Sequence, residues 1–382
     1  MTVAVRIGIF FFNIIYFFIK LCPTRNKVTF ISRQKNTPSI DFILLKTELH
    51  KTDPSIKVVI LCKRLEKGFK KKILYVFHMF KQMYHIATSK VVVLDSYCIT
   101  ISILKHKKKL KVVQMWHALG SFKKFGKSII GKGESSVDIQ GVNKIEMQDL
   151  TRIMQMHKNY NYIFASSKES CIGFSDAFGY PIDYFKVFPL PRVDLIISEK
   201  NQTEIKSKIY EKYPQLTKKK NILYCPTFRK DKSDTKYIKD LINRIDYKKY
   251  NLIVKLHPLT KLNINNKNIV FDKSFNTYEM GFVSDYIITD YSAVVFELSL
   301  LKKPLYFYTY DIDTYLDKRD FYLDYNKEMP GIISSDLDII LSNINNDNYD
   351  MQKINKFNKK YITIPSKGCS NSITKFIINL TK

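Results

Sequence analysis

The chain has 382 residues, of which 45% are hydrophobic and 14% aromatic, with only 12 glycines and 12 prolines. This composition excludes a disordered or fibrous protein, and the length predicts two domains. The net charge of +28 predicts a surface that attracts anions, such as nucleotides, anionic lipid headgroups, nucleic acid or a phosphate polymer.

The first predicted element is an apolar helix near the N-terminus. Residues 7–19 carry no charge and lie between Arg6 and Lys20. As a helix this segment is roughly 20 Å long, which is shorter than the ~30 Å hydrocarbon core of a bilayer. No small-residue cleavage site follows, so we expect no signal peptide. We predict that residues 1–26 form a helix associated with the inner face of a membrane. A buried first helix is the alternative, and both can hold together.

Short β-branched runs alternate with helical stretches along the rest of the chain, which predicts α/β domains with parallel, doubly wound sheets. Residues 27–194 are expected to form an N-terminal Rossmann-like domain and residues 221–382 a C-terminal one, joined by the polar segment 195–220. The predicted strands are Val28–Ser32, Lys57–Cys62, Lys90–Leu94, Lys111–Trp116 and Tyr162–Ser166, then Asn221–Cys225, Asn251–Leu256, Ile269–Phe271, Tyr286–Thr289 and Pro304–Tyr308.

A histidine follows the fourth predicted strand, in the sequence QMWHALG. Ligands of such sheets bind beyond the carboxyl ends of the strands, so polar residues at these ends are the candidate site residues. His117 can act there as a general base near neutral pH, and Gly120 allows close approach of the backbone. Lys123 and Lys124 are candidates for holding an anionic acceptor. A structural histidine and a solvated basic loop are the alternatives.

Two strands of the second set also end in polar side chains. Arg229 follows ILYCPTF, where its guanidinium can bind phosphate oxygens with two hydrogen bonds, and His257 ends VKLHP. Two Asp-x-Asp sequences, at Asp311–Asp313 and Asp336–Asp338, can hold a metal–nucleotide complex. Neither clearly ends an apolar strand, so we interpret both as chance matches.

The segment FVSDYIITDYSAVVFE is the most informative part of the sequence. Its apolar strand runs into Thr289, Asp290, Tyr291 and Ser292, and an apolar helix is expected to begin at Ala293. A helix N-terminus offers unpaired N–H groups and the positive end of a dipole to phosphate. Ser292 or Asp290 can cap that helix. An ordinary capped junction between strand and helix is the alternative.

The six cysteines form no CxxC pair and have no histidine at zinc-ligand spacing. Several lie inside apolar runs, where cysteine acts as a small hydrophobic residue. The cysteines therefore predict a reducing, cytosolic compartment and no metal site.

In chain order, WHALGSFKKFG, ILYCPTFR, VKLHP and SDYIITDYSAVVFELSLLKKPLYFYTYD resemble the CDP-glycerol:polyglycerophosphate glycerophosphotransferases, which build teichoic acids and related polyol-phosphate polymers. The resemblance runs from about Lys111 to Gly331. It implies a GT-B-like fold, in which two Rossmann-like domains face each other across a cleft. It also implies transfer of glycerol phosphate or ribitol phosphate from CDP-glycerol or CDP-ribitol to a lipid-linked acceptor, with release of CMP, at the cytoplasmic face of an anionic membrane.

The resemblance assigns roles to individual residues. His117 resembles the proposed catalytic base of the family, and His257 resembles a second essential histidine near the pyrophosphate. Ala118, Ala293 and Glu297 depart from the usual family pattern and leave the choice of polyol open. The residues expected at the CDP-alcohol are Thr227, Arg229, Thr289, Asp290, Tyr291, Ser292 and Glu297, and those expected at the acceptor are Gly120, Lys123, Lys124 and Arg192.

No cofactor is expected, because the CDP-alcohol is a substrate, and the need for a divalent ion stays open. No nucleic-acid-binding motif is present, so nucleic acid is not an expected partner. One alternative is a GT-B glycosyltransferase that uses a nucleotide sugar, which a screen of donors would distinguish. The other is a non-catalytic basic protein that binds membranes or nucleic acid and needs neither His117 nor His257.

Overall fold

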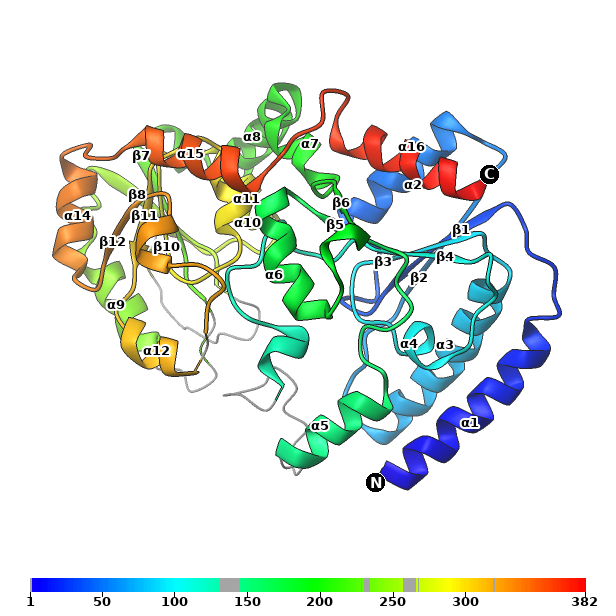
Figure 1. Ribbon diagram of the computed structural model, residues 1–382. Helices are drawn as coiled ribbons and strands as arrows, with labels where there is room; N and C mark the ends of the chain where they lie inside the picture. Colours follow the sequence, from blue (N-terminus) through cyan, green and yellow to red (C-terminus); the bar gives the residue numbers. More distant parts are fainter. Residues whose placement is uncertain are drawn as a thin grey trace. The chain divides into compact units, whose positions relative to one another are not determined.

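The computed structural model describes residues 2–130, 144–227, 229, 234–256, 266, 268–318 and 320–382. It contains two compact units, which are described separately below (Figure 1). Unit 1 comprises residues 1–192 and 363–382, and unit 2 comprises residues 193–362.

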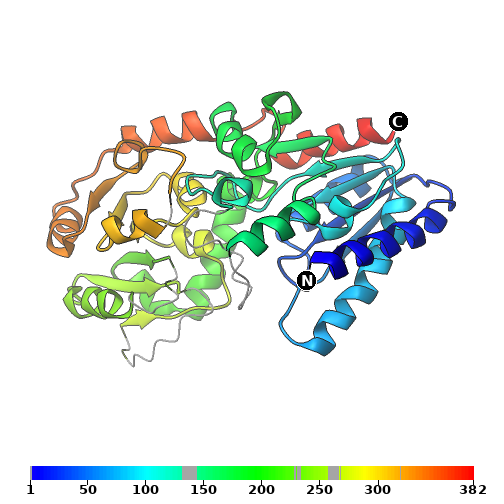
Figure 2. The ribbon, with the colours of Figure 1, turned by 60° about the horizontal axis from the view of Figure 1, so that its bottom comes forward.

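Unit 1 is built on a parallel sheet of six strands in the order β2-β1-β3-β4-β5-β6. Every residue of β3 is buried, as expected for a parallel sheet covered on both faces. Figures 1 and 2 show α2 and α16 on one face and α1, α3 and α4 on the other. Its elements are α1 (Thr2–Ile19), β1 (Lys27–Ser32), α2 (Ile40–Thr52), β2 (Lys57–Cys62), α3 (Phe69–Ala87), β3 (Val91–Leu94), α4 (Ile99–Ile103), β4 (Lys111–Gln114), η1 (Gly126–Ile129), α5 (Lys144–Ile153), β5 (Tyr162–Ala165), α6 (Lys168–Phe178), η2 (Ile182–Tyr184), β6 (Phe185–Val187) and α16 (Cys369–Thr381).

The helix α1 has one face packed on unit 1 and one apolar face exposed. Tyr16 is completely buried, and its hydroxyl lies 2.9 Å from Nδ1 of His106. On the other face, Phe10 and Phe17 are 63% and 58% exposed. By length and composition alone, α1 is long and apolar enough to cross a membrane. The predicted helix is therefore present, and it combines a buried face with an apolar face that unit 1 leaves uncovered.

Unit 2 is built on a second parallel sheet, in the order β12-β11-β10-β7-β8-β9. Counted from β7, this is the 3-2-1-4-5-6 order of the dinucleotide-binding Rossmann fold. Two Rossmann-like α/β sheets confirm the predicted fold class. After α7 (Arg192–Ile197), at the boundary between the units, its elements are α8 (Glu199–Lys212), η3 (Pro214–Thr217), β7 (Lys220–Cys225), α9 (Thr235–Arg244), β8 (Tyr250–Val254), β9 (Ile269–Val270), α10 (Thr277–Phe282), β10 (Tyr286–Thr289), α11 (Val295–Ser299), β11 (Leu305–Tyr308), α12 (Ile312–Lys318), α13 (Tyr325–Glu328), β12 (Ile332–Ser334), α14 (Leu337–Asn345) and α15 (Met351–Tyr361).

The boundaries of the units differ from the predicted domains. The C-terminal helix α16 belongs to unit 1, where it packs against α2 (Figure 1). Its Phe376 ring lies 5.1 Å from the ring of Tyr162, and Thr381 accepts a hydrogen bond of 2.5 Å from Lys90. The predicted connection 195–220 is part of unit 2, because Ile209 of α8 is completely buried there. The unit to which α8 or α16 belongs depends on where its apolar face is buried. The position of the helix in the chain does not show this.

The sequence also missed two strands. β6 and β12 have three residues each and form the ends of their sheets. Runs this short show no recognisable alternation of apolar and polar residues.

Candidate functional site

In unit 1, His117 lies near the topological switch point of the sheet, where the strand order reverses. Because β1 lies between β2 and β3, a crevice is expected beyond the carboxyl ends of β1 and β3. Nδ1 of His117 is 2.9 Å from the carbonyl oxygen of Asp95, which follows β3. The same atom is 3.2 Å from the amide nitrogen of Gln34, which follows β1. The structure thus brings His117, from the end of β4, to the ends of two other strands.

The contact with Asp95 fixes the tautomer of His117. A backbone carbonyl can only accept a hydrogen bond, so Nδ1 of His117 donates and Nε2 keeps its lone pair. The amide nitrogen of Gln34 is itself a donor, so its longer contact with Nδ1 is not a hydrogen bond in this tautomer. Burial lowers the pKa of His117 below its usual value, although the hydrogen bond to Asp95 opposes this shift. The imidazole is therefore neutral near pH 7, and its Nε2 is suited to accept a proton.

The ring of Trp116 packs against the imidazole of His117. Its φ of 62° is in the left-handed region, which costs a residue with a side chain about 1–3 kcal/mol. The N–H of Trp116 donates a 2.9 Å hydrogen bond to Oε1 of Gln114. Its ring centroid is 4.2 Å from that of His117 and 5.1 Å from that of Phe125. Sequence reasoning noted Trp116 only as a neighbour and missed this positioning role, and it missed Asp95 entirely.

Arg192, which was predicted at the acceptor, makes contacts inside unit 1. Its Nη2 and Nε lie 2.5 and 3.0 Å from Oδ2 of Asp41, a carboxylate that is 1% exposed. Nη2 is also 3.2 Å from the backbone carbonyl oxygen of His117. Through these donors Arg192 helps to position the backbone of His117, and its part in acceptor binding stays a prediction.

The other predicted acceptor residues follow His117 along the chain. Gly120 is buried and has no positive φ, and the preceding carbonyl of Leu119 accepts a 2.5 Å hydrogen bond from Ser166. Lys123 is half-buried, with its ammonium 5.7 Å from the centroid of the Phe122 ring. Lys124 is half-buried as well. Their part in acceptor binding stays a prediction.

In unit 2, the corresponding crevice is expected between β7 and β10, where the strand order reverses. The backbone N–H of Thr227 donates to both carboxylate oxygens of Asp290, at 2.9 and 3.0 Å. The hydroxyl of Thr227 donates to Oδ1 at 2.6 Å. Thr289 is completely buried and donates to the carbonyl of Cys225 at 2.9 Å. The structure therefore joins the predicted residues of β7 and β10 at one edge of the sheet.

Arg229 belongs to the same cluster, but its geometry differs from the prediction of a phosphate ligand. The residue is 7% exposed. Its Nε and Nη2 lie 2.8 and 3.1 Å from the carboxylate oxygens of Asp311, and Nη2 is 3.2 Å from Oδ2 of Asp290. Its guanidinium also lies 4.7 Å from the centroid of the Tyr315 ring. These contacts show that Arg229 organises the strand ends, and its predicted contact with phosphate stays a prediction.

The two Asp-x-Asp sequences have structural roles in unit 2. Asp311 follows β11 closely and pairs with Arg229, which is a structural contact and not evidence of a metal–nucleotide site. Asp336 caps α14 by accepting a hydrogen bond from the N–H of Asp338, and Asp338 pairs with Arg244.

The predicted helix start after β10 is displaced by two residues. The five-residue helix α11 begins at Val295, with Val294 as its N-cap and no side-chain cap. Ser292 accepts a long 3.4 Å hydrogen bond from the N–H of Val294, and Asp290 does not cap because its carboxylate is bound to Thr227 and Arg229. Among the described residues, the backbone N–H groups of Ser292 and Ala293 have no acceptor, and both residues are half-exposed. This turn therefore offers two N–H groups to an anion.

Tyr291 and Glu297 are both buried. Tyr291 is completely buried and stacks on Tyr315 at a centroid distance of 4.0 Å. Glu297, in α11, is 6% exposed. Their predicted contact with a CDP-alcohol stays a prediction.

His257 lies outside the described residues, so its predicted role is not examined by the structure. Within the described part of the chain, no group of three or more histidine, cysteine, aspartate or glutamate side chains is arranged to hold a metal ion.

Comparisons with known proteins give a consistent result. A family model described as CDP-glycerol:poly(glycerophosphate) glycerophosphotransferase matches residues 14–379. The chain is 32% identical to a teichoic acid ribitol-phosphate primase of Bacillus spizizenii, over 94% of this chain and 92% of the relative. It is 31% identical to a teichoic acid glycerol-phosphate primase of Bacillus subtilis, over 79% of this chain and 77% of the relative. The structure of the wall teichoic acid polymerase TagF aligns with a TM-score of 0.71 and 20% identity, over 95% of this chain and 89% of that chain, which shows a shared fold.

Proposed function

Because the chain belongs to the CDP-glycerol:poly(glycerophosphate) glycerophosphotransferase family, we propose that it transfers a polyol phosphate from a CDP-alcohol to a hydroxyl of a lipid-linked acceptor in teichoic acid synthesis. The observation that carries this proposal is the state of His117. Its Nδ1 donates to a carbonyl at the end of β3, which leaves Nε2 as the proton acceptor at the carboxyl edge of the sheet.

The proposed reaction is a single displacement at phosphorus. The acceptor hydroxyl gives its proton to Nε2 of His117 while its oxygen attacks the phosphorus that carries the polyol. A new P–O bond forms, and the bond from this phosphorus to the bridging oxygen breaks, so that CMP leaves with the electron pair. We assign the N–H groups of Ser292 and Ala293 to the phosphate oxygens, where they offset the charge that develops on CMP.

We propose ribitol phosphate as the polyol, with the chain acting as a primase. Support comes from the ribitol-phosphate primase of B. spizizenii, which matches this chain over nearly the whole length of both proteins. The H444N variant of the related TagF has been studied after soaking with CDPG.

The choice of donor is tested by measuring CMP release by the purified protein with CDP-ribitol or CDP-glycerol and a lipid-linked acceptor. We expect kcat/KM to be about tenfold or more higher for CDP-ribitol, because a site that hydrogen-bonds the longer polyol is left unpaired by the shorter one. A preference for CDP-glycerol would reverse the choice of polyol. Activity with UDP-sugars and none with either CDP-alcohol would replace the proposed transfer by glycosyl transfer.

We further propose that unit 1 binds the cytoplasmic face of an anionic membrane through α1 and α3, as a peripheral protein. The two helices lie side by side (Figure 2). The rings of Phe12 and Phe80 are stacked between them, with their centroids 5.4 Å apart. On α3, Phe69 and Phe77 are 79% and 66% exposed. The exposed Lys70 and neighbouring lysines suit anionic headgroups. Each lysine near such a surface contributes about 1 kcal/mol to the free energy of membrane binding.

Replacing Phe10 and Phe17 by glutamate tests this surface. Burying each ring contributes about 1.5–3 kcal/mol, so we expect the double variant to bind vesicles containing phosphatidylglycerol roughly 100-fold more weakly in co-sedimentation. Tyr16 stays in place, because deletion of α1 would expose the core of unit 1. Ile172→Glu, at a 60% exposed position on α6, is the control. Unchanged binding by the double variant would contradict a membrane role for this face of α1.

A further inference from the structure

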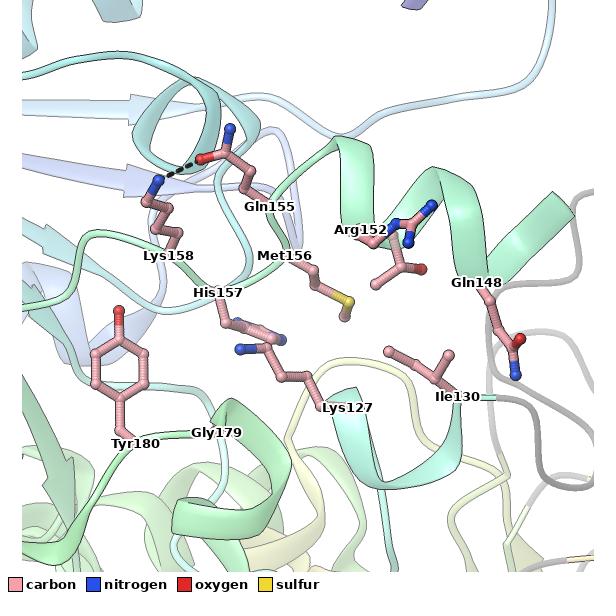
Figure 3. A pocket seen from close by; sticks show the side chains of 11 residues that line it. Lys127, Ile130, Gln148, Arg152, Gln155, Met156, His157, Lys158, Gly179 and Tyr180 are labelled. Atoms are coloured by element: carbon pink, nitrogen blue, oxygen red, sulfur yellow. Dashed lines mark hydrogen bonds between the residues drawn. The ribbon is translucent and has the colours of Figure 1, made fainter. Parts of the chain in front are cut away.

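Unit 1 contains a pocket of about 550 Å³ that the proposed reaction does not use. Figure 3 shows its wall, formed by η1, the end of α5, the segment that leads to β5, and the end of α6. Its charged lining residues are all cationic, namely Lys127, Arg152 and Lys158. Arg152 pairs with Asp149 at 3.0 Å, and Lys158 donates to Gln155 at 2.7 Å. The lining of the pocket is therefore positively charged.

Of these three cations, Lys127 has the fewest polar contacts that offset its charge. Within the described part of the chain, its ammonium makes no hydrogen bond or ion pair. Burial lowers the pKa of Lys127 below its usual value. The Lys127 side chain stays exposed, so an anion can reach its ammonium, and an ammonium without a counter-ion gains a charge-assisted hydrogen bond from that anion.

His157 provides a second unsatisfied group at the same place. It is 1% exposed, and its Nδ1 lies 3.0 Å from the hydroxyl of Tyr160. That hydroxyl accepts a hydrogen bond from the amide of Gln114, at 3.0 Å, and the arrangement that also uses its own hydrogen is donation to Nδ1 of His157, which we adopt. The hydrogen of His157 is therefore on Nε2, which has no partner among the described residues. A buried N–H without an acceptor costs about 1–3 kcal/mol.

The neutral state of His157 does not depend on pH in the physiological range. Burial lowers its pKa to about 3, and Lys127 and Arg33 contribute to the shift. Figure 3 shows the Lys127 side chain beside the ring of His157.

The backbone around His157 is strained. Gln155, His157 and Asn159 have φ values of 49°, 62° and 71°, each in the left-handed region that costs about 1–3 kcal/mol for such residues. Asn159 is tied to the carbonyl of Ile101 at 2.8 Å, which helps to hold this conformation. Strain of this kind is concentrated at ligand sites, where it fixes groups before the ligand arrives.

We propose that this pocket binds a phosphodiester group of the acceptor chain. This proposal rests on the proposed function, because a polyol-phosphate acceptor carries such groups close to its reactive hydroxyl. Trp116 links the pocket to the base, since its ring centroid lies 6.2 Å from that of His157 and 4.2 Å from that of His117. Lys127 binds the phosphate oxygens, and Arg152 and Lys158 supply the surrounding positive field.

Binding can be measured without turnover, because Trp116 is the only tryptophan of the chain. We expect glycerophosphoglycerol, a soluble phosphodiester, to change the fluorescence of the full-length protein saturably in the absence of a CDP-alcohol. Lys127→Met is expected to weaken this binding roughly tenfold or more, the usual effect of losing a hydrogen bond to a charged group. Lys158→Met should weaken it less. Lys51→Met, at an exposed position of α2, removes the same charge and should have no effect.

Three outcomes would overturn the proposal: wild-type binding by Lys127→Met, no saturable change in fluorescence, or binding of pyrophosphate with no binding of glycerophosphoglycerol. The last result would assign the pocket to the diphosphate of the lipid carrier. In the active enzyme, Lys127→Met should raise the KM of the acceptor and leave the KM of the CDP-alcohol unchanged. If the protein binds the probe through Lys127 but transfers no polyol phosphate, phosphodiester binding by the pocket is supported and the proposed function is refuted.

Discussion

Replacing His117 by asparagine is expected to lower kcat by about 10²–10⁴-fold, the usual contribution of a general base. The asparagine amide can still donate to the carbonyl of Asp95, so the position of the side chain is kept while the lone pair of Nε2 is lost. The KM of the CDP-alcohol should not change, because the N–H groups assigned to its phosphates belong to unit 2. Steady-state kinetics with each substrate varied in turn would measure both values.

The pH profile of kcat provides a second measure of the same role. The pKa of His117 is lowered, so Nε2 stays unprotonated to lower pH than in an ordinary histidine. In the wild type, kcat is therefore expected to be flat around pH 7 and to fall only below the usual range of histidine. His117→Asn should lack this acidic fall. His50→Asn, at an exposed position of α2, should behave as the wild type. An active His117→Asn enzyme with an unchanged pH profile would exclude His117 as the base.

Replacing Arg229 by methionine is expected to lower the free energy of unfolding by about 3–5 kcal/mol, because two carboxylates then lose their shared cation in a buried place. Asp290 is 1% exposed, and the Asp311 side chain is 17% exposed. Urea unfolding followed by circular dichroism would measure the loss. Asp311→Asn in the methionine variant should restore part of the stability, since it removes one of the two unpaired charges.

Arg244 offers a matched control, because its ion pairs with Asp240 and Asp338 are at the surface. Arg244→Met should cost only about 0–1 kcal/mol, as exposed ion pairs do. The two interpretations of Arg229 predict different results. A phosphate ligand would raise the KM of the CDP-alcohol in a variant of unchanged stability, and that result would contradict the structural role assigned here.

The strands and the position of the site could be predicted from the sequence because they depend on local pattern. Continuous apolar runs such as Tyr286–Thr289 predict buried parallel strands, and the structure has β10 at those residues. Parallel strands end at the same edge of a sheet, so Thr227 and Asp290 were expected to lie together, and the carboxylate does accept from Thr227. His117 was expected at a strand end for the same reason.

The roles of individual side chains needed the tertiary structure. Arg192 pairs with Asp41, 151 residues earlier in the chain, and Arg229 pairs with Asp311, 82 residues later. Local pattern shows that such residues lie near strand ends, but it does not show which carboxylate faces which cation, because that depends on strand order. The same holds for α16, whose apolar face is buried on unit 1 although the helix follows unit 2 in the chain. The sequence by itself thus determined the family, the two sheets and the strand ends at which the candidate site residues lie. Only the packing of distant segments decided which polar groups are neutralised there and which, such as Nε2 of His117, keep a lone pair.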